Sequence, residues 1–273
     1  MRNTISIVGF ALLFCFIQSS RAQESAPTTA PESQPFTLNP DDLGKAAQSV
    51  NMFTGEVSLP LPLGGVSSRN GLSASISASY SSAGITEQYT TWNREKPTGV
   101  LGLGWTLSTS KIVRDNKQTG TPEDDTYYLI EGGSSSKLVR IGGSSTARQY
   151  ATENYQFWKI TYYSSSKKWE ITREDGTLYT YGGAEHAREY AVRWGNWIGN
   201  SARTSGQSQQ EISWSLSEIR NVYNNRIFFE YDKVENKVGG TLGQYHTEAS
   251  YLSRIRSDLG AEVDFVYDDK NGN

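Results

Sequence analysis

The sequence contains very little cysteine or histidine. Its 273 residues include one cysteine, Cys15, and two histidines, His186 and His246. A single cysteine cannot form an intramolecular disulfide or a thiolate zinc site. Two histidines leave few ligands for a histidine-based metal centre. We therefore expect neither a metal site nor a cofactor.

Strong charge and a long apolar run are also lacking. The net charge of −3 provides no bulk attraction to nucleic acid or to an anionic membrane. The apolar run at residues 5–17 spans thirteen residues, whereas a membrane-spanning helix needs about 20. We therefore expect no nucleic-acid binding and no stable membrane insertion.

Residues 1–22 have the pattern of a secretory signal peptide. Arg2 precedes the apolar run, and Ser20 and Ala22 place small residues at the −3 and −1 positions of a cleavage site. An uncleaved anchor is the alternative. Cleavage would remove Cys15 and two arginines, leaving 24 basic and 29 acidic residues and a net charge of −5. We expect a secreted, extracellular protein without disulfides.

The mature chain divides by composition into a tether and a domain. Residues 23–45 are rich in Pro, Ser and Thr, which is typical of a flexible linker. Residues 46–273 hold most of the aromatic side chains, and a content of 12% aromatic residues argues against general disorder. We expect residues 46–273 to form a β domain.

Two segments near the start of this domain alternate with a period of two. Leu72, Ile76 and Tyr80 belong to a series of apolar residues that alternates with serines over residues 72–80, which predicts a strand with one buried face. Residues 57–63 alternate as well, but Pro60 and Pro62 fall between the apolar positions. Because proline cannot donate a ladder hydrogen bond, we expect this strand at a sheet edge.

Similar patterns predict further strands, separated by short Gly-, Ser- and Asp-containing turns. They cover residues 105–113, 126–130, 137–141, 157–163, 168–173, 177–181, 212–219, 226–231, 251–255 and 262–267. The spacing of Ala187, Tyr190, Ala191 and Trp194 predicts a helix over residues 184–194, with an irregular loop as the alternative. The fold class is all-β, an antiparallel array of hairpins, and a β-sandwich is the alternative.

An internal repeat with an offset of 36 residues lies near the C-terminal end. Residues 216–232 align with residues 252–268, and seven of the seventeen aligned positions agree. Each unit reads as a strand, a turn and a second strand that ends in Tyr-Asp. Hairpins repeated at a fixed period predict an extended sheet built by stacking. Asn271 and Gly272 then predict a hairpin turn without a returning strand, as in a truncated chain. A natural tail is the alternative.

Several of these stretches resemble the N-terminal region of SpvB/TcaC-type toxin proteins and the related Rhs/YD-repeat proteins. The resemblance is carried by residues 51–63, by Gly102-Leu103-Gly104-Trp105-Thr106-Leu107-Ser108, by residues 123–129 and 169–182, and by the two Tyr-Asp units. It spans roughly residues 50–268. It implies part of a curved β shell that encloses a C-terminal cargo absent from this chain, with the rest of the shell or other toxin-complex subunits as partners. The ADP-ribosyltransferase of some relatives needs Glu-x-Glu, which is absent from this sequence.

No pattern in the sequence identifies a catalytic site. Acidic residues such as Glu123, Asp124 and Asp125 are present, but no spacing marks a facing carboxylate pair, and we expect no enzymatic activity. An extracellular carbohydrate- or protein-binding module is the alternative function. Its candidate site is a platform formed by Trp194 and Trp197, which could stack on a surface glycan, although large aromatics more often pack in a core. A β-fold hydrolase is the third hypothesis.

Overall fold

The computed structural model describes residues 50–51, 54–82, 101–102, 104–117, 124–193, 208–238 and 244–267. Every described residue belongs to one unit, Lys45–Asn273. The predicted signal peptide 1–22 and the predicted linker 23–45 lie outside the described residues.

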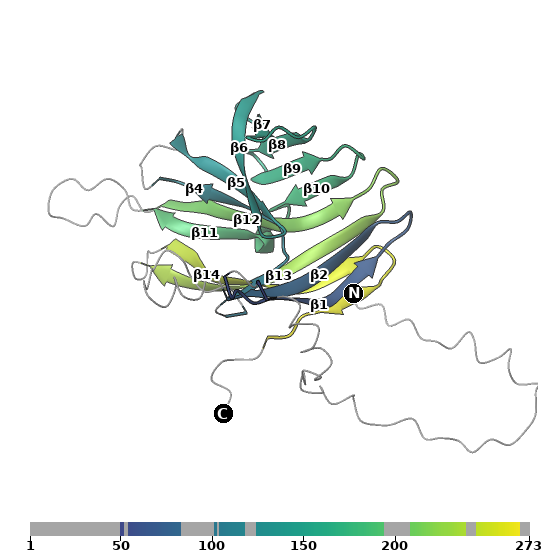
Figure 1. Ribbon diagram of the computed structural model, residues 1–273. Coiled ribbons are helices and arrows are strands. Elements are labelled where there is room, and N and C mark those ends of the chain that lie inside the picture. The colour runs from purple at the N-terminus through teal and green to yellow at the C-terminus, as the bar shows by residue number, and fades with distance from the viewer. Residues whose placement is uncertain are drawn as a thin grey trace, which may run out of the picture. The chain divides into compact units, whose positions relative to one another are not determined.

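The described residues form antiparallel strands joined by short turns (Figure 1), which confirms the predicted all-β class. No α-helix occurs in this part of the chain. The elements are β1 (Ser58–Ser67), β2 (Ser73–Ser81), β3 (Trp105–Leu107), β4 (Lys111–Asp115), β5 (Thr126–Glu131), β6 (Ser134–Gly143), β7 (Ala147–Thr152), β8 (Lys159–Tyr163), β9 (Lys168–Thr172), β10 (Leu178–Tyr181), the 3₁₀ turn η3 (Glu185–Ala187), β11 (Arg188–Arg193), β12 (Ser208–Arg220), β13 (Arg226–Val238), β14 (Gln244–Ser257) and β15 (Glu262–Asp264).

The first three strands form a small sheet in the order β1-β2-β3. The predicted alternation of β2 is confirmed, because Ile76 and Ala78 are buried while serines occupy the opposite face. The predicted edge position of β1 is confirmed too. Its register shifts between Pro62 and Gly64, and this irregularity leaves Leu63 exposed, contrary to the simple alternation.

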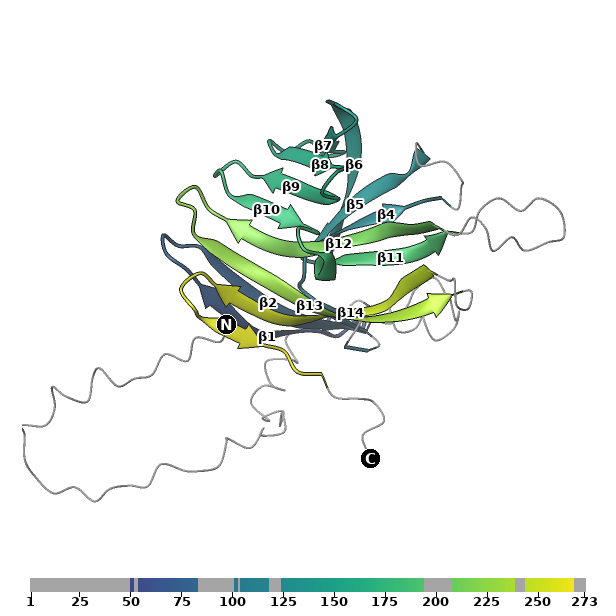
Figure 2. The same ribbon diagram turned by 180° about the vertical axis from the view of Figure 1, so that it is seen from behind.

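The remaining twelve strands form one large sheet, part of which closes into a barrel. Strands β4 to β10 follow one another as hydrogen-bonded neighbours. β12 then pairs with β4 through residues 213–215 and with β10 through residues 216–220, which completes a ring of eight strands. Figures 1 and 2 show these strands from opposite sides. The sequence analysis expected a hairpin array or a sandwich and did not foresee this closure.

β12 is shared by the barrel and by the strands that extend beyond it. One of its edges pairs first with β4 and then, at residues 218–220, with β13. The other edge pairs with β11 and then with β10. The order β12-β13-β14-β15 therefore continues the sheet outward from the barrel wall.

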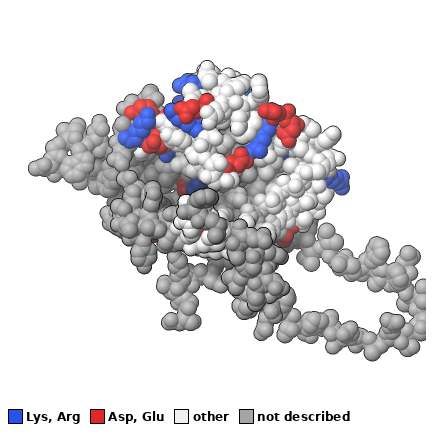
Figure 3. All heavy atoms as spheres, in the orientation of Figure 1, with Lys and Arg blue, Asp and Glu red and all other residues white. Residues whose placement is uncertain are grey.

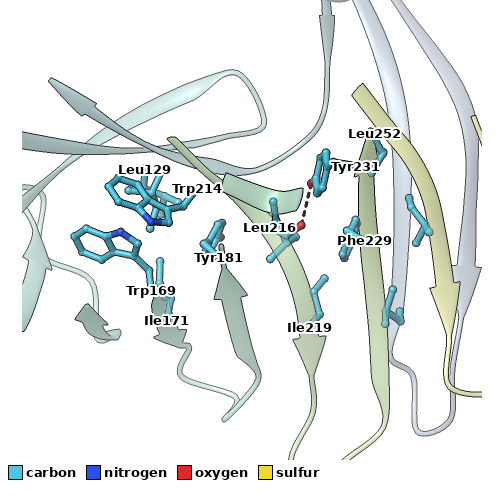
Figure 4. Close-up of a cluster of buried hydrophobic side chains, with 14 of the residues drawn as sticks. Leu129, Trp169, Ile171, Tyr181, Trp214, Leu216, Ile219, Phe229, Tyr231 and Leu252 are labelled. Carbon is cyan, nitrogen blue, oxygen red and sulfur yellow. Dashed lines mark hydrogen bonds between the residues drawn. The ribbon is translucent and has the colours of Figure 1, made fainter. Parts of the chain in front are cut away.

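Aromatic side chains fill the barrel. Trp169 and Trp214 are 0% and 1% exposed, and their ring centroids are 5.9 Å apart. The Tyr127 ring lies 4.9 Å from Trp169 and 6.0 Å from Trp214. Figure 4 shows that the buried cluster continues along the neighbouring strands through Leu216 and Phe229. The barrel is therefore a packed core and not a hollow container.

One strand predicted from the sequence is divided between the two sheets. The prediction of a single strand over residues 105–113 is wrong, because β3 belongs to the small sheet and β4 to the barrel. Ser108, Thr109 and Ser110 separate them. The Ser108 hydroxyl accepts a hydrogen bond from the Ser77 amide at 2.8 Å, and a side chain that bonds to backbone in this way competes with ladder pairing.

The helix predicted over residues 184–194 is also wrong within the described residues. A single 3₁₀ turn precedes β11, which pairs with β12. The Tyr190 amide donates to the Thr247 hydroxyl of β14 at 3.0 Å. Pairing with distant strands thus determines the conformation here, and the local pattern of apolar residues does not.

One strand, β7, was missed because its sequence, Ala-Arg-Gln-Tyr-Ala-Thr, has no strict alternation.

Candidate functional site

The tryptophans predicted to form a ligand platform cannot be placed. Trp194 and Trp197 lie outside the described residues. The predicted glycan or partner platform therefore stays a prediction.

The two histidines belong to different elements. His186 lies in η3, and its Nε2 atom is 3.4 Å from the carbonyl oxygen of Phe229. His246 lies in β14, where its Nδ1 atom is buried and has no hydrogen-bond partner among the described residues. Across the described ranges, no three or more His, Cys, Asp and Glu side chains are grouped in a way that could hold a metal ion.

Two nearly buried carboxylates are engaged in ion pairs. Asp125, from the acidic segment singled out in the sequence, accepts a hydrogen bond from Arg114 Nε at 2.8 Å. Glu211 pairs with Lys167. Both carboxylates are therefore occupied by ion pairs with side chains from other segments of the chain.

Burial keeps the hydroxyls of three tyrosines protonated. Burial raises the pKa of Tyr127 to about 12, and it also raises the pKa of Tyr181 and of Tyr231. The Tyr181 hydroxyl lies 3.0 Å from the Ser110 hydroxyl. The Tyr231 hydroxyl donates to the Leu216 carbonyl at 2.9 Å (Figure 4).

This tyrosine bond closes a gap in the ladder. Leu216 lies between the stretch of β12 that pairs with β4 and the stretch that pairs with β13. The Tyr231 hydroxyl therefore supplies a donor at the point where one strand neighbour replaces another. The second repeat does the same, because Tyr267 donates to the Leu252 carbonyl at 3.0 Å. The two tyrosine-to-carbonyl hydrogen bonds are thus related by the same offset of 36 residues as the sequence repeat.

The turns of the two repeats also correspond atom by atom. In each, the first residue of the turn donates its amide to the fifth residue's carbonyl, and the fourth donates to the first. The fourth residue has a positive φ, 65° for Asn224 and 86° for Gly260. The hydrogen bonds are Asn221 N to Asn225 O at 3.1 Å, Asn224 N to Asn221 O at 3.0 Å, Ser257 N to Ala261 O at 2.8 Å and Gly260 N to Ser257 O at 3.1 Å. Such turns suit antiparallel hairpins, so each repeat is one hairpin unit.

The described part of the chain contains a groove of about 410 Å³. Residues of β9, β10, β12, β13 and β14 and of η3 line it. Its lining includes Phe228, and the Arg256 guanidinium lies over this ring at 4.5 Å from the ring centroid. Sequence reasoning missed this groove because its lining residues are scattered between Lys168 and Arg256 and converge only when β10, β12 and β13 pair.

Charges of opposite sign are interspersed on one face of the described part of the protein (Figure 3). On the face seen in Figure 3, acidic and basic side chains are interspersed and form no patch of one sign. Within the described ranges, no helix is long and apolar enough to span a bilayer.

Comparison with known proteins yields distant similarities. No family model matches the chain. The salivary gland surface protein 1 of Aedes aegypti is 23% identical over 221 residues, which cover 79% of this chain and 6% of that protein. The chain thus corresponds to a small fraction of the length of this relative.

Two solved structures are also similar. The N-terminal domain of effector protein SpvB from Salmonella typhimurium strain LT2 matches 77% of this chain and 66% of its own, with 18% identity and a TM-score of 0.48. The Photorhabdus luminescens Tc holotoxin pore matches 74% of this chain and 9% of its own, with 17% identity and a TM-score of 0.48.

Proposed function

We propose that this chain is a non-enzymatic, extracellular wall segment of a larger toxin-like protein of the Rhs/YD-repeat type, which encloses a cargo polypeptide carried elsewhere. The toxin-like assignment rests on the sequence motifs described above. The mechanism is enclosure: a continuous wall of hydrogen-bonded strands separates the cargo from solvent and proteases, and the wall itself needs no reactive group.

The repeated hairpin is the observation that carries this proposal. The β12–β13 and β14–β15 hairpins share their turn and their tyrosine-to-carbonyl bond, and they lie side by side through the β13–β14 pairing. A hairpin that pairs with an equivalent hairpin can be followed by further equivalent hairpins, which extend the same sheet. The β14–β15 hairpin would then serve as the template for a following unit.

Ion pairs support the same arrangement, because they connect neighbouring strands. Arg256 of β14 pairs with Glu230 of β13 at 2.9 Å, and Arg254 of β14 pairs with Asp264 of β15. Each pair alone contributes little at an exposed site, because solvent screens the two charges. Repeated across successive strands, they favour one register over another.

The location of the cargo follows from the packed core. Tryptophan and tyrosine side chains fill the barrel, so a cargo cannot lie inside it. The wall would instead enclose the cargo in company with further strands, and the barrel would anchor one end of that wall. An extracellular site is supported by the predicted signal peptide and by the name of the mosquito relative, a surface protein.

The test begins with the natural coding sequence beyond Asn273. We expect further Tyr-Asp hairpins at a spacing of about 36 residues, followed by an unrelated C-terminal segment. Limited proteolysis of that complete protein should then leave the C-terminal segment intact under conditions that digest the same segment expressed alone. A coding sequence without further hairpins, or equal digestion in both contexts, would refute the enclosure function.

A further inference from the structure

Two arginines lie opposite each other at the base of the first repeated hairpin. Arg220 of β12 and Arg226 of β13 are direct cross-strand partners, and both line the groove of about 410 Å³. Directly opposite residues have Cβ atoms about 4.5–5.5 Å apart, and like charges at such positions oppose folding. The arrangement is therefore unfavourable unless something else compensates for the charge.

The second repeat shows the favourable alternative at the same position. Its equivalent residues, 36 positions later, are Arg256 and Glu262, which are cross-strand partners of opposite charge. The first arginine is thus present in both hairpins, whereas its partner changes from Glu262 in the second unit to Arg226 in the first. One scaffold therefore holds both a neutral pair and a doubly positive pair.

The carboxylates of the groove do not neutralise Arg220. Each of the other lysine and arginine side chains in the groove has a carboxylate within 4 Å, whereas the Arg220 side chain makes no hydrogen bond or ion pair with any described residue. The existing pairs are Lys168 with Glu170 at 2.6 Å, Arg226 with Glu218 at 3.7 Å and Arg256 with Glu230 at 2.9 Å. The pair made by Arg226 is the longest of the three, and its second guanidinium contact is the Asn224 side-chain oxygen at 3.1 Å.

We propose that this groove binds an oxyanion group, a sulfate, phosphate or carboxylate, between Arg220 and Arg226. Guanidinium groups present planar, paired donors that match such oxygens, and two residues that carry them lie opposite each other in the lining of this groove. The groove volume falls in the range of small-molecule sites, about 300–1,000 Å³, so the ligand class is a small molecule or sugar residue that carries one oxyanion. This proposal is independent of the enclosure function, since a wall needs no ligand.

The binding test uses the purified chain with inorganic sulfate, inorganic phosphate and glucuronate as separate probes. Calorimetric titration and thermal unfolding are compared with sodium chloride at equal ionic strength, which removes general screening. We expect saturable binding and a rise in Tm with at least one probe. The strongest of the three identifies the oxyanion, which distinguishes a sulfated, phosphorylated or carboxylated ligand.

Two variants and one control locate the site. Arg220→Gln removes the unpaired guanidinium. Arg226→Glu recreates the Arg–Glu cross-strand pair of the second hairpin, and it also removes the ion pair of Arg226 with Glu218. Each should weaken binding roughly tenfold or more, because a charge-assisted hydrogen bond is lost. Arg254→Gln, at an arginine paired with Asp264 on the neighbouring strands, should leave affinity unchanged.

The outcomes separate clearly. Binding that both groove variants abolish and the control retains would establish the site. Stabilisation by all three oxyanions that is no greater than that by chloride would overturn the proposal, and so would wild-type affinity in Arg226→Glu. Near-ultraviolet circular dichroism of each variant confirms that a loss of binding does not reflect unfolding.

Discussion

Removing a single hydroxyl should reveal how much the gap in the β12 ladder matters. In the variant Tyr231→Phe, the ring would still pack, since Tyr231 is 7% exposed, but the 2.9 Å bond to the Leu216 carbonyl would be lost. A buried acceptor left without a donor costs about 1–3 kcal/mol. We expect the free energy of unfolding to fall by about 2 kcal/mol. For a domain of 150–250 residues, this corresponds to a decrease in Tm of roughly 4–8 °C.

The equivalent bond of the second repeat provides a graded comparison. Tyr267 makes its bond at 3.0 Å in a partly exposed position, so water can replace part of the interaction in Tyr267→Phe. We expect a loss of about 0.5–1 kcal/mol there. Tyr223, on the turn of the first hairpin, is 69% exposed, and Tyr223→Phe should change stability by less than about 0.5 kcal/mol.

Urea denaturation followed by tryptophan fluorescence measures all three variants. The slope of unfolding free energy against urea should stay constant, since the surface exposed on unfolding does not change. Equal stabilities of Tyr231→Phe and Tyr223→Phe would refute the reasoning, because they would mean that the Leu216 carbonyl does not depend on this donor.

Three further predictions concern other parts of the molecule. Burial raises the pKa of Tyr127 from 10.0 to about 12. The contribution of this side chain to stability, on the order of 3 kcal/mol, is therefore fully present below pH 10 and is lost as the pH rises to about 12. Urea midpoints measured across this range should fall, and a pH-independent midpoint would contradict the shift. Gly182→Ala should destabilise the folded state by at least about 2 kcal/mol, because Gly182 has φ +65° and an added Cβ would lie 2.3 Å from Trp214 Cδ1. Gly132→Ala is the control, because Gly132 has φ +56° and nothing lies within 4 Å of an added Cβ. Equal effects of the two variants would exclude the clash. If the chain binds a glycan through Trp194 and Trp197, replacing both with Ala should abolish binding on a glycan array without lowering Tm, and unchanged binding would rule out that platform.

Local alternation was the part of the fold that the sequence revealed best. β2 was foreseen because serine and apolar residues alternate over its whole length, and the edge position of β1 followed from Pro60 and Pro62. The bulge between Pro62 and Gly64 was not foreseen. It depends on how β1 meets β2, and no local composition encodes that register.

Long-range pairing was the part that the sequence could not reveal. The closure of the barrel joins Lys111 to Ser215 and Tyr181 to Leu216, contacts for which the sequence contains no local signal. The helix expected near Tyr190 failed for the same reason, because β12 and the Thr247 hydroxyl determine its conformation.

The candidate sites also combine local features that the sequence could predict with long-range pairings that it could not. The tyrosines of the repeated hairpins were visible as Tyr-Asp endings, although their carbonyl partners were not. The groove depends on Arg220 and Arg226 lying opposite each other, and the only clue in the sequence was a comparison of the two repeats. Where the second repeat has Glu262, the first has an arginine.

The position of β12 in the chain sets the order in which the protein can assemble. Strands β4 to β10 are synthesised first and can pair in sequence as hairpins, but β4 and β10 each keep one unpaired edge until residues 213–220 have emerged. During synthesis, the edges of β4 and β10 therefore remain open to pairing with other chains, a known route to aggregation. A chain that stopped between residues 181 and 213 would leave an open sheet in which Trp169 lacks its contact with Trp214. Residues 213–220 of β12 then pair with the open edges of β4 and β10 and close the barrel.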